Sequence, residues 1–360
     1  MRILSPRLHR RNLTDSAGPP GDVSLPTNRG RTYPLFAVCG VLVVPLLVLH
    51  LPDDASAQAS GEIPPQAAAV GYKTNTFRAT FSKSAIDMDN TGKSGFQWYP
   101  WRFFGQPTTP PETIKIGGDG ILTLGTDTLG SSIATGAPTK TASHWVGTAF
   151  GGGAYFEAAL RFDPDRTAKG KSASWPAFWS MAVEHTAGLS SQHWPGQPPG
   201  YMHFAELDFF EYDLRSFSPQ NYYGGALHEW WGIYKTTCPG TGFCGASNAG
   251  RGGSNFSNFK VKTPSETDFK SFHRFGVLWV PASPANKGYA QYYFDGAATD
   301  DKVSWDQYAS QPPSPGAAPW TFGILDKQHL IIVLSTGIGQ PMTVGSVLVW
   351  QGSTAQNLSQ

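Results

Sequence analysis

An acidic, alternating segment constrains this chain more than any other part of it: His203-Phe-Ala-Glu206-Leu-Asp208-Phe-Phe-Glu211-Tyr-Asp213. A β-strand sends alternate residues to opposite faces, so Glu206 and Asp208 share one face and their apolar neighbours point the other way. Glu211 has the wrong parity for the acidic face, and one extra residue after Asp208, a β-bulge, restores it. The segment therefore predicts a bulged strand with a packed back and three carboxylates on its front, with Asp213 joining them.

An ordinary antiparallel strand with a solvated acidic face is the alternative interpretation, because such faces are common. The scarcity of charged residues elsewhere in the chain argues against this alternative. Only 15% of the chain is charged, yet three acids lie within six residues with no basic residue between them. Like charges this close raise a pKa and cost stability, which is typical of functional sites. We therefore interpret the segment as a candidate site for cleaving a bond with a pair of carboxylates.

The rest of the chain predicts an all-β fold. It has 41 Gly and 29 Pro, and 13% of its residues are aromatic. Short apolar or alternating runs are separated by turn residues, which is typical of a sandwich or barrel. We expect strands at 121–124, 154–162, 178–183, 203–212, 224–227, 272–280, 289–294, 330–334 and 346–350. The runs 272–280 and 289–294 are expected to form a hairpin, and 195–200, 239–257 and 311–319 to be loops.

The N-terminal part has the features of a secretory signal peptide. Six arginines precede an apolar run over 35–51, and the small-residue pattern Ala55-Ser-Ala57 follows it. An uncleaved membrane anchor is the alternative, but the run is short for a span and contains Pro45. We expect residues 1–57 to be a basic region and signal peptide, 58–71 a flexible leader, and 72–360 a single domain. The mature protein is then secreted or periplasmic, without stable membrane association.

Cysteine usage and net charge narrow the function further. The mature chain would keep Cys238 and Cys244, which flank a turn-rich segment and form a plausible disulfide in an exported protein. Two free thiols are the alternative. The formal net charge is +1, so nothing in the charge balance indicates a nucleic-acid partner.

Aromatic residues gather near the acidic strand in the sequence, and such side chains can stack on the apolar faces of sugar rings. The candidates for substrate binding are Trp175, Trp179, His228, Trp230 and Trp231. Core packing is an equal alternative for any one tryptophan. Since adjacent strand residues face opposite ways, one of Trp230 and Trp231 is expected to face the cleft. His228 could hydrogen-bond a substrate or a carboxylate, or be structural.

These residues resemble glycoside hydrolase family 16, the group of laminarinases, agarases and carrageenases. Glu206-Leu-Asp208-Phe-Phe-Glu211 is similar to the E-x-D-x-x-E motif of its bulged members. Weaker similarities are the segments 175–179, 227–228, 272–279, 292–296 and 342–351. Gly345 and Ala205 depart from the usual pattern, and the region before Ala154 matches loosely.

The resemblance implies a β-jelly roll of two curved antiparallel sheets and endo-cleavage of a β-linked polysaccharide with retention. It implies that Glu206 is the nucleophile, Glu211 the acid/base and Asp208 the assisting carboxylate, with no cofactor and no metal. We expect a monomer that acts on β-1,3 or β-1,3-1,4-glucan. A galactan hydrolase of the agarase or carrageenase type, a transglycosylase, and a jelly roll that binds glycans without cutting them are the alternatives.

Overall fold

Antiparallel strands make up most of the part of the chain that the structure describes. The computed structural model of the 360-residue chain describes residues 62–100, 109–139, 145–168, 175–184, 201–213, 221–234, 243–244, 253–307, 322–352 and 356–357. All these residues belong to one unit. Every pairing between its named strands is antiparallel.

One sheet, here the back sheet, has eight strands in the described residues. Their order is β15-β14-β13-β7-β17-β3-β2, with β1 also paired to β17. The strands are β1 (Thr74–Arg78), β2 (Ile114–Ile116), β3 (Leu122–Leu124), β7 (Ala154–Phe162), β13 (His273–Val280), β14 (Gly288–Phe294), β15 (Ala297–Trp305) and β17 (Met342–Gln351).

The second sheet, here the cleft sheet, has ten strands within the described ranges. Their order is β11-β10-β9-β8-β16-β6-β18, with β12 paired to β10, β4 to β16 and β5 to β6. The strands are β4 (Ser131–Ala134), β5 (Gly136–Pro138), β6 (Trp145–Gly151), β8 (Ala177–Ala182), β9 (Tyr201–Glu211), β10 (Tyr222–Tyr234), β11 (Phe243–Cys244), β12 (Gly253–Lys262), β16 (His329–Thr336) and β18 (Gln356–Asn357).

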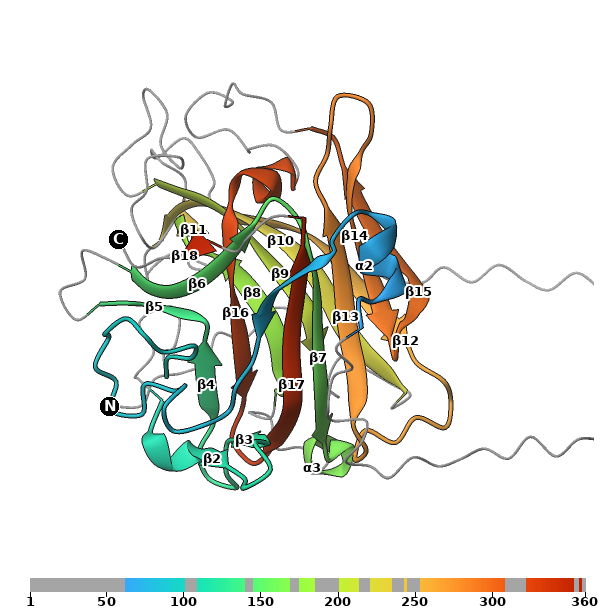
Figure 1. Cartoon of the computed structure of the whole chain (residues 1–360). Helices are drawn as coiled ribbons and strands as arrows, with labels where there is room; N and C mark the ends of the chain where they lie inside the picture. The colour runs from blue at the N-terminus through green and yellow to red at the C-terminus, as the bar shows by residue number, and fades with distance from the viewer. Residues whose placement is uncertain are drawn as a thin grey trace, which may run out of the picture. The chain divides into compact units, whose positions relative to one another are not determined.

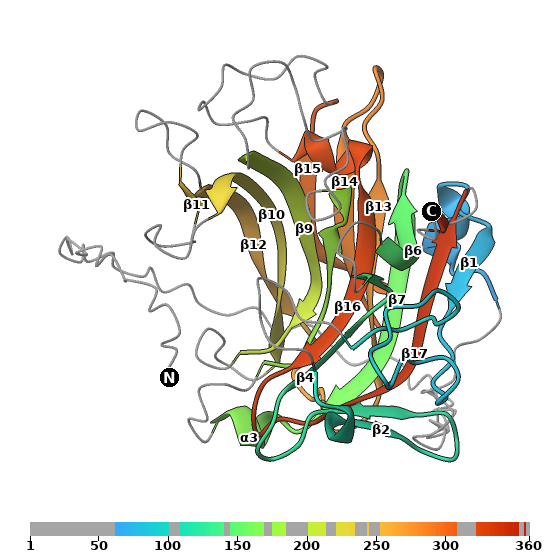
Figure 2. The ribbon, with the colours of Figure 1, turned by 90° about the vertical axis from the view of Figure 1, so that its left-hand side faces the viewer.

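The core lies between these two sheets, whose central strands form separate layers (Figures 1 and 2). Phe209 of β9 stacks on Phe156 of β7, with ring centroids 4.7 Å apart. The ring of Phe210 of β9 packs against Phe275 of β13 in a tilted arrangement, with ring centroids 4.3 Å apart. Large aromatic pairs of this kind bury much apolar surface, so they hold the acidic strand firmly against the back sheet. The expected sandwich of two antiparallel sheets is thus confirmed.

The expected hairpin between 272–280 and 289–294 is also confirmed, as β13 and β14 pair from Phe275↔Phe294 to Val280↔Tyr289. The next hairpin turns at Asp295 and Gly296, which have φ values of 49° and 83°. An Asp-Gly pair with two positive φ values is typical of the tight turns that match the twist of paired strands. This turn carries the chain from β14 into the edge strand β15.

Several strands lie where the apolar pattern predicted none, and β12 and β15 show why. β12 begins at Gly253, inside the expected loop 239–257, and pairs with β10 over ten residues from Tyr222 to Trp231. β15 has the sequence AATDDKVSW and is exposed at most positions. Both are edge strands, and polar residues are tolerated at the edge of a sheet. Hydrophobic periodicity therefore does not detect them.

Helices are short in the described residues and lie outside the sheets: α2 (Pro65–Ala69), α3 (Pro164–Ala168) and the 3₁₀ turns Pro111–Thr113 and Gly323–Lys327. α2 falls within the expected leader 58–71, and its Ala67 is buried against Tyr72 and Trp350. The packed structure therefore begins before residue 72. The expected signal peptide lies outside the described residues. No helix within the described ranges is long and apolar enough to cross a membrane.

Candidate active site

Strand β9 carries the three acids, and the predicted bulge lies between them. Asp208 is paired with Ala226 of β10 and Glu211 with Gly224, so β9 advances three residues while β10 advances two. The pairing with β8 shows the same single extra residue at Phe209. Both Phe209 and Phe210 are fully buried in the core. The extra residue therefore turns Glu211 to the same face as Glu206 and Asp208.

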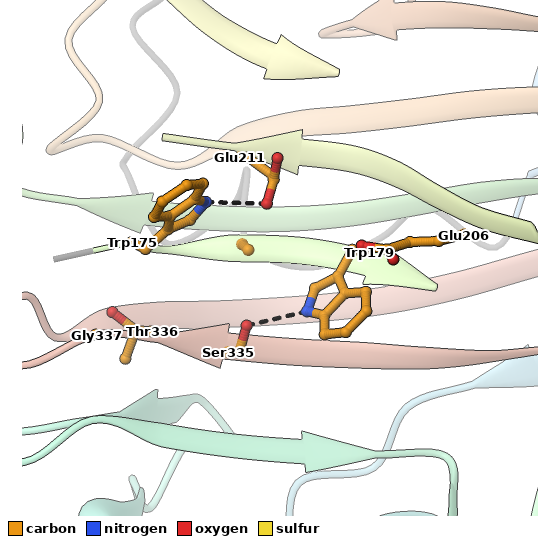
Figure 3. Close-up of a pocket in the computed structure, with 8 residues that line it drawn as sticks. Trp175, Trp179, Glu206, Glu211, Ser335, Thr336 and Gly337 are labelled. Atoms are coloured by element: carbon orange, nitrogen blue, oxygen red, sulfur yellow. Dashed lines mark hydrogen bonds between the residues drawn. The ribbon is translucent and has the colours of Figure 1, made fainter. Parts of the chain in front are cut away.

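The acidic face forms one wall of a pocket on the cleft sheet. The pocket has a volume of about 340 Å³ and is formed by three neighbouring strands, β8, β9 and β16, with the residues just beyond them. Its lining residues are Trp175, Ala177, Trp179, Glu206, Glu211, Ser335, Thr336 and Gly337 (Figure 3). The two glutamates start about 13 Å or more apart along the strand at about 3.3 Å per residue. Since both line this pocket, their side chains converge on one space.

Glu206 is held by the indole of Trp230, a residue of the adjacent strand β10. The Nε1 atom of Trp230 donates a hydrogen bond of 2.8 Å to Oε2 of Glu206. His228 stacks on the same indole, with ring centroids 5.4 Å apart. Of the two adjacent tryptophans, Trp230 is thus the one that faces the acids. The side chain of Trp231 lies outside the described residues.

Glu211 has an indole partner of its own. The Nε1 atom of Trp175 donates a 2.9 Å hydrogen bond to Oε1 of Glu211, as Figure 3 shows. Trp175 is 38% exposed, which is unusual for so large an apolar side chain. Its ring can therefore contact a ligand while its N–H orients the carboxyl group.

Asp208 lies deepest of the three acids, with 1% of its surface exposed. Its Oδ2 atom is 3.1 Å from Nε2 of His228. Its Oδ1 atom is buried and has no hydrogen-bond partner among the described residues. His228 thus contacts a carboxylate of the trio, which is one of the three roles considered for it.

Burial is the main cause of the raised pKa values in this cluster. It raises the pKa of Glu211 to about 8, and the charges of Asp208 and Asp213 add to this, while Trp175 acts the other way. Burial also raises the pKa of Asp208 to about 8, opposed by a hydrogen bond from Glu206. Protons in such a cluster belong to the group as a whole rather than to one residue.

Glu206 differs from expectation in this respect. Burial raises its pKa well above the ordinary value, and the charge of Asp208 adds to the effect. The imidazole of His228 and the indole N–H of Trp230 lower it. A nucleophilic carboxyl has to be ionised, and the close spacing of the acids in the sequence predicts that repulsion between them raises a pKa. In the structure the buried environment raises the pKa of both glutamates, and repulsion is the smaller cause.

Of the remaining predicted site residues, the structure places Trp179 in the pocket but does not describe the side chains of the two cysteines. Trp179 lines the pocket, and its Nε1 atom donates to Oγ of Ser335 at 3.0 Å. Ser335, Thr336 and Gly337 were not predicted, because β16 carries no local motif. The backbone of Cys244 belongs to β11, but its side chain and all of Cys238 lie outside the described residues.

A metal ion is the other ligand that the acidic face could hold. One donor atom each from Glu206, Asp208 and His228 lie within 4.8 Å of one another. Asp208 and His228 already contact each other through two of the available atoms, and Glu206 bonds Trp230. A cation would have to replace these contacts, so we assign no metal to the site.

The chain was compared with known proteins and solved structures. No protein-family model matches the sequence, and no curated protein does. Among solved structures, the endo-1,3-β-glucanase from Streptomyces sioyaensis is 18% identical, with a TM-score of 0.42, over 77% of this chain and 95% of its own. LamA from Z. galactanivorans in complex with laminaritriose and laminaritetraose is 12% identical, with a TM-score of 0.35, over 67% of this chain and 82% of its own. The carbohydrate recognition domain of Emp46p is 10% identical, with a TM-score of 0.32, over 67% of this chain and 86% of its own.

Proposed function

We propose that this protein is a secreted or periplasmic, endo-acting, retaining glycoside hydrolase that cleaves a β-linked polysaccharide, most specifically a β-1,3 or β-1,3-1,4-glucan. The observation that carries the proposal is the convergence of Glu206 and Glu211 on one pocket, each bonded to its own tryptophan N–H. Retaining glycosidases need one carboxyl that donates a proton and a second that attacks the sugar. A binding module has no need of a buried acid pair, whose repulsion costs stability.

Glu211 is the acid/base in this proposal. Its pKa of about 8 keeps it protonated at neutral pH, so it can protonate the glycosidic oxygen. The leaving sugar then departs with that proton. Glu211, now ionised, takes a proton from the water that hydrolyses the glycosyl-enzyme.

Glu206 is the nucleophile, and Asp208 makes its ionisation possible. Burial raises the pKa of Asp208 to about 8, so this carboxyl is protonated at neutral pH. A neutral Asp208 places no negative charge beside Glu206, so Glu206 can release its own proton to solvent and become negative. Trp230 then donates to the Glu206 carboxylate, which attacks the anomeric carbon. Asp208 thus assists by removing a charge that would oppose the ionisation of Glu206.

A neutral glucan fits the described pocket better than a sulfated galactan. The lining residues include two glutamates and no lysine or arginine among the residues that the structure describes. Arg274 belongs to the back sheet, where its guanidinium bonds the backbone carbonyl of Asp295. A sulfated substrate calls for cations in the cleft, so we place carrageenan behind β-glucan and keep unsulfated galactan as the second candidate.

The decisive experiment is to incubate the purified mature protein with laminarin, lichenan, agarose and carrageenan and to size the products over time. The proposal expects a ladder of oligosaccharides from a β-glucan and none from the Glu206→Gln variant. Larger products than the starting chains would indicate transglycosylation instead. Binding of laminarin by the wild-type protein without any new reducing ends would establish a glycan-binding function and overturn the proposal. The same preparation in a sizing column tests the expected monomer.

A further inference from the structure

Tyr292 reaches the acidic strand from the opposite sheet. It lies on β14 of the back sheet, and its side chain is fully buried. Its hydroxyl oxygen is 3.0 Å from the carbonyl oxygen of Asp208 and 3.2 Å from that of Ala226. Asp208 and Ala226 are paired residues of β9 and β10. One hydroxyl group therefore contacts both strands at the position where their register changes.

The bulge in β9 needs such a contact. An extra residue interrupts the backbone ladder and leaves a polar group that the neighbouring strand does not pair. A buried group left without a partner costs about 1–3 kcal/mol. Tyr292 supplies a donor at the Asp208 carbonyl, directly before Phe209, the extra residue. This contact favours the bulged strand over a regular one, in which Glu211 would point into the core.

Gly225 makes room for this contact. It lies on β10 between Gly224 and Ala226, where the register with β9 shifts. A Cβ atom added at Gly225 would lie 2.3 Å from Cε1 of Tyr292 and 2.8 Å from Cζ. Only a residue without a side chain lets the tyrosine ring lie this close to the strand. Gly225 and Tyr292 thus depend on each other, although they lie in different sheets: the missing side chain of Gly225 allows the ring of Tyr292 to approach the strand.

The hydroxyl of Tyr292 stays protonated at neutral pH. Burial raises the pKa of this phenol well above its ordinary value, and the charge of Asp208 raises it further. Glu211 contributes in the same direction. Tyr292 is therefore a permanent hydrogen-bond donor that lies within electrostatic reach of both carboxyl groups.

We infer that Tyr292 is a positioning residue for the three acids: its hydroxyl holds the β9 bulge from inside the sandwich and so fixes Glu211 relative to Glu206 and Asp208. The inference rests on the proposed hydrolase function, in which the rate depends on accurate placement of the two glutamates. Tyr292 touches neither the pocket nor the substrate space, and it acts through the backbone of Asp208.

The test compares Tyr292→Phe with Tyr72→Phe in the mature protein. Tyr72 is also buried and donates its hydroxyl to a backbone carbonyl, that of Trp279, at 3.0 Å, so the two variants lose the same kind of bond. Tyr292→Phe should lower kcat on laminarin about 10- to 100-fold, because a small misplacement of reacting groups is costly. KM should stay within about twofold, because no lining residue changes. Tyr72→Phe should leave kcat unchanged.

A second measurement does not depend on activity. Hydrogen exchange of the amides at 208–211 should be faster in Tyr292→Phe than in the wild type. The carboxyl ¹³C signal of Glu211, assigned with Glu211→Gln, should titrate at lower pH because a looser bulge admits water. Gly225→Ala should reproduce both changes, and adding Tyr292→Phe to it should cause little further loss.

The outcomes separate the two proposals. An inactive wild-type protein overturns the hydrolase function, while the exchange and titration data still decide the role of Tyr292. Unchanged exchange and titration in Tyr292→Phe overturn the positioning role. So does an equal loss of kcat in Tyr72→Phe, since that would reflect general destabilisation.

Discussion

The indole nitrogen of Trp230 lies 2.8 Å from Oε2 of Glu206, and this bond has a counterpart 2.9 Å long between Trp175 and Glu211. Each candidate catalytic carboxyl thus has its own neutral N–H donor, supplied from a different segment of the chain. A donor to a carboxylate favours the ionised form and lowers the pKa. The two tryptophans therefore adjust the two glutamates independently.

The first prediction follows from this separation. Trp230→Phe removes the donor to Glu206, so the pKa of Glu206 rises and the acidic limb of the kcat/KM profile moves to higher pH. Trp175→Phe removes the donor to Glu211, so its pKa rises from about 8 and the alkaline limb moves to higher pH. Trp179→Phe is the matched control, because the Nε1 atom of Trp179 donates to the hydroxyl of Ser335. Movement of the same limb in both variants would contradict the assignment of nucleophile and acid.

The second prediction concerns the carboxyls themselves. Glu206→Gln and Glu211→Gln should each lower kcat by at least about 100-fold, the usual contribution of a positioned acid or base. Asp208→Asn should lower it less, because Asp208 holds a proton for its neighbour. Glu157→Gln is the control: Glu157 is also buried with a raised pKa, but it lies on β7 of the back sheet. All four proteins should keep the wild-type circular dichroism spectrum.

Much of this site follows from the local sequence, because both faces of β9 are constrained. The acids fix one face and the phenylalanines the other, so the bulge is the one arrangement that satisfies both. The choice between Trp230 and Trp231 does not follow, since alternation leaves the phase of β10 open. Ser335 and Tyr292 could not be found either. Ser335 contacts Trp179 from 156 residues away in the sequence, and Tyr292 contacts Asp208 from 84 residues away. No local sequence pattern predicts contacts over such distances.

The third prediction is that the acid cluster makes the fold less stable as pH rises. Asp208 and Glu211 have folded-state pKa values of about 8, against 3.8 and 4.5 for the ordinary groups. Between these values the unfolded chain has released protons that the folded chain retains, so the free energy of unfolding falls as pH increases. The contribution of Asp208 and Glu211 to the free energy of unfolding is therefore greatest below pH 4 and is fully lost above pH 8.

Asp208→Asn should therefore be more stable than the wild type at pH 8 and differ little from it at pH 4. The melting temperature should gain about 2–4 °C for each kcal/mol regained. Exposed Glu112→Gln serves as the control and should follow the wild-type curve at both pH values. A wild-type stability that rises from pH 4 to pH 8 while Asp208→Asn remains flat would show that burial does not raise the pKa of Asp208.

The fourth prediction is a disulfide between Cys238 and Cys244, motivated by their spacing and the expected export. Mature protein that has not been reduced should show no reactive thiol after unfolding. Such a short closed loop should contribute only about 2 kcal/mol, since the stabilisation grows with loop length. The double variant Cys238→Ala with Cys244→Ala should be as active as the wild type. Two labelled thiols per chain would rule the disulfide out.

The last prediction is the stereochemical outcome, where the convergence of Glu206 and Glu211 is tested most directly. Inverting enzymes keep their carboxyls about 6.5–9.5 Å apart to admit a water, while retaining enzymes bring them to about 5–5.5 Å. If the bulge held by Tyr292 turns both side chains into one small pocket, water cannot enter between Glu206 and the sugar, and the reaction passes through a glycosyl-enzyme. Proton NMR of a β-glucan digest in its first minutes should then show the β-anomer before mutarotation. An initial α-anomer would mean direct attack by water, and the nucleophile would not be Glu206.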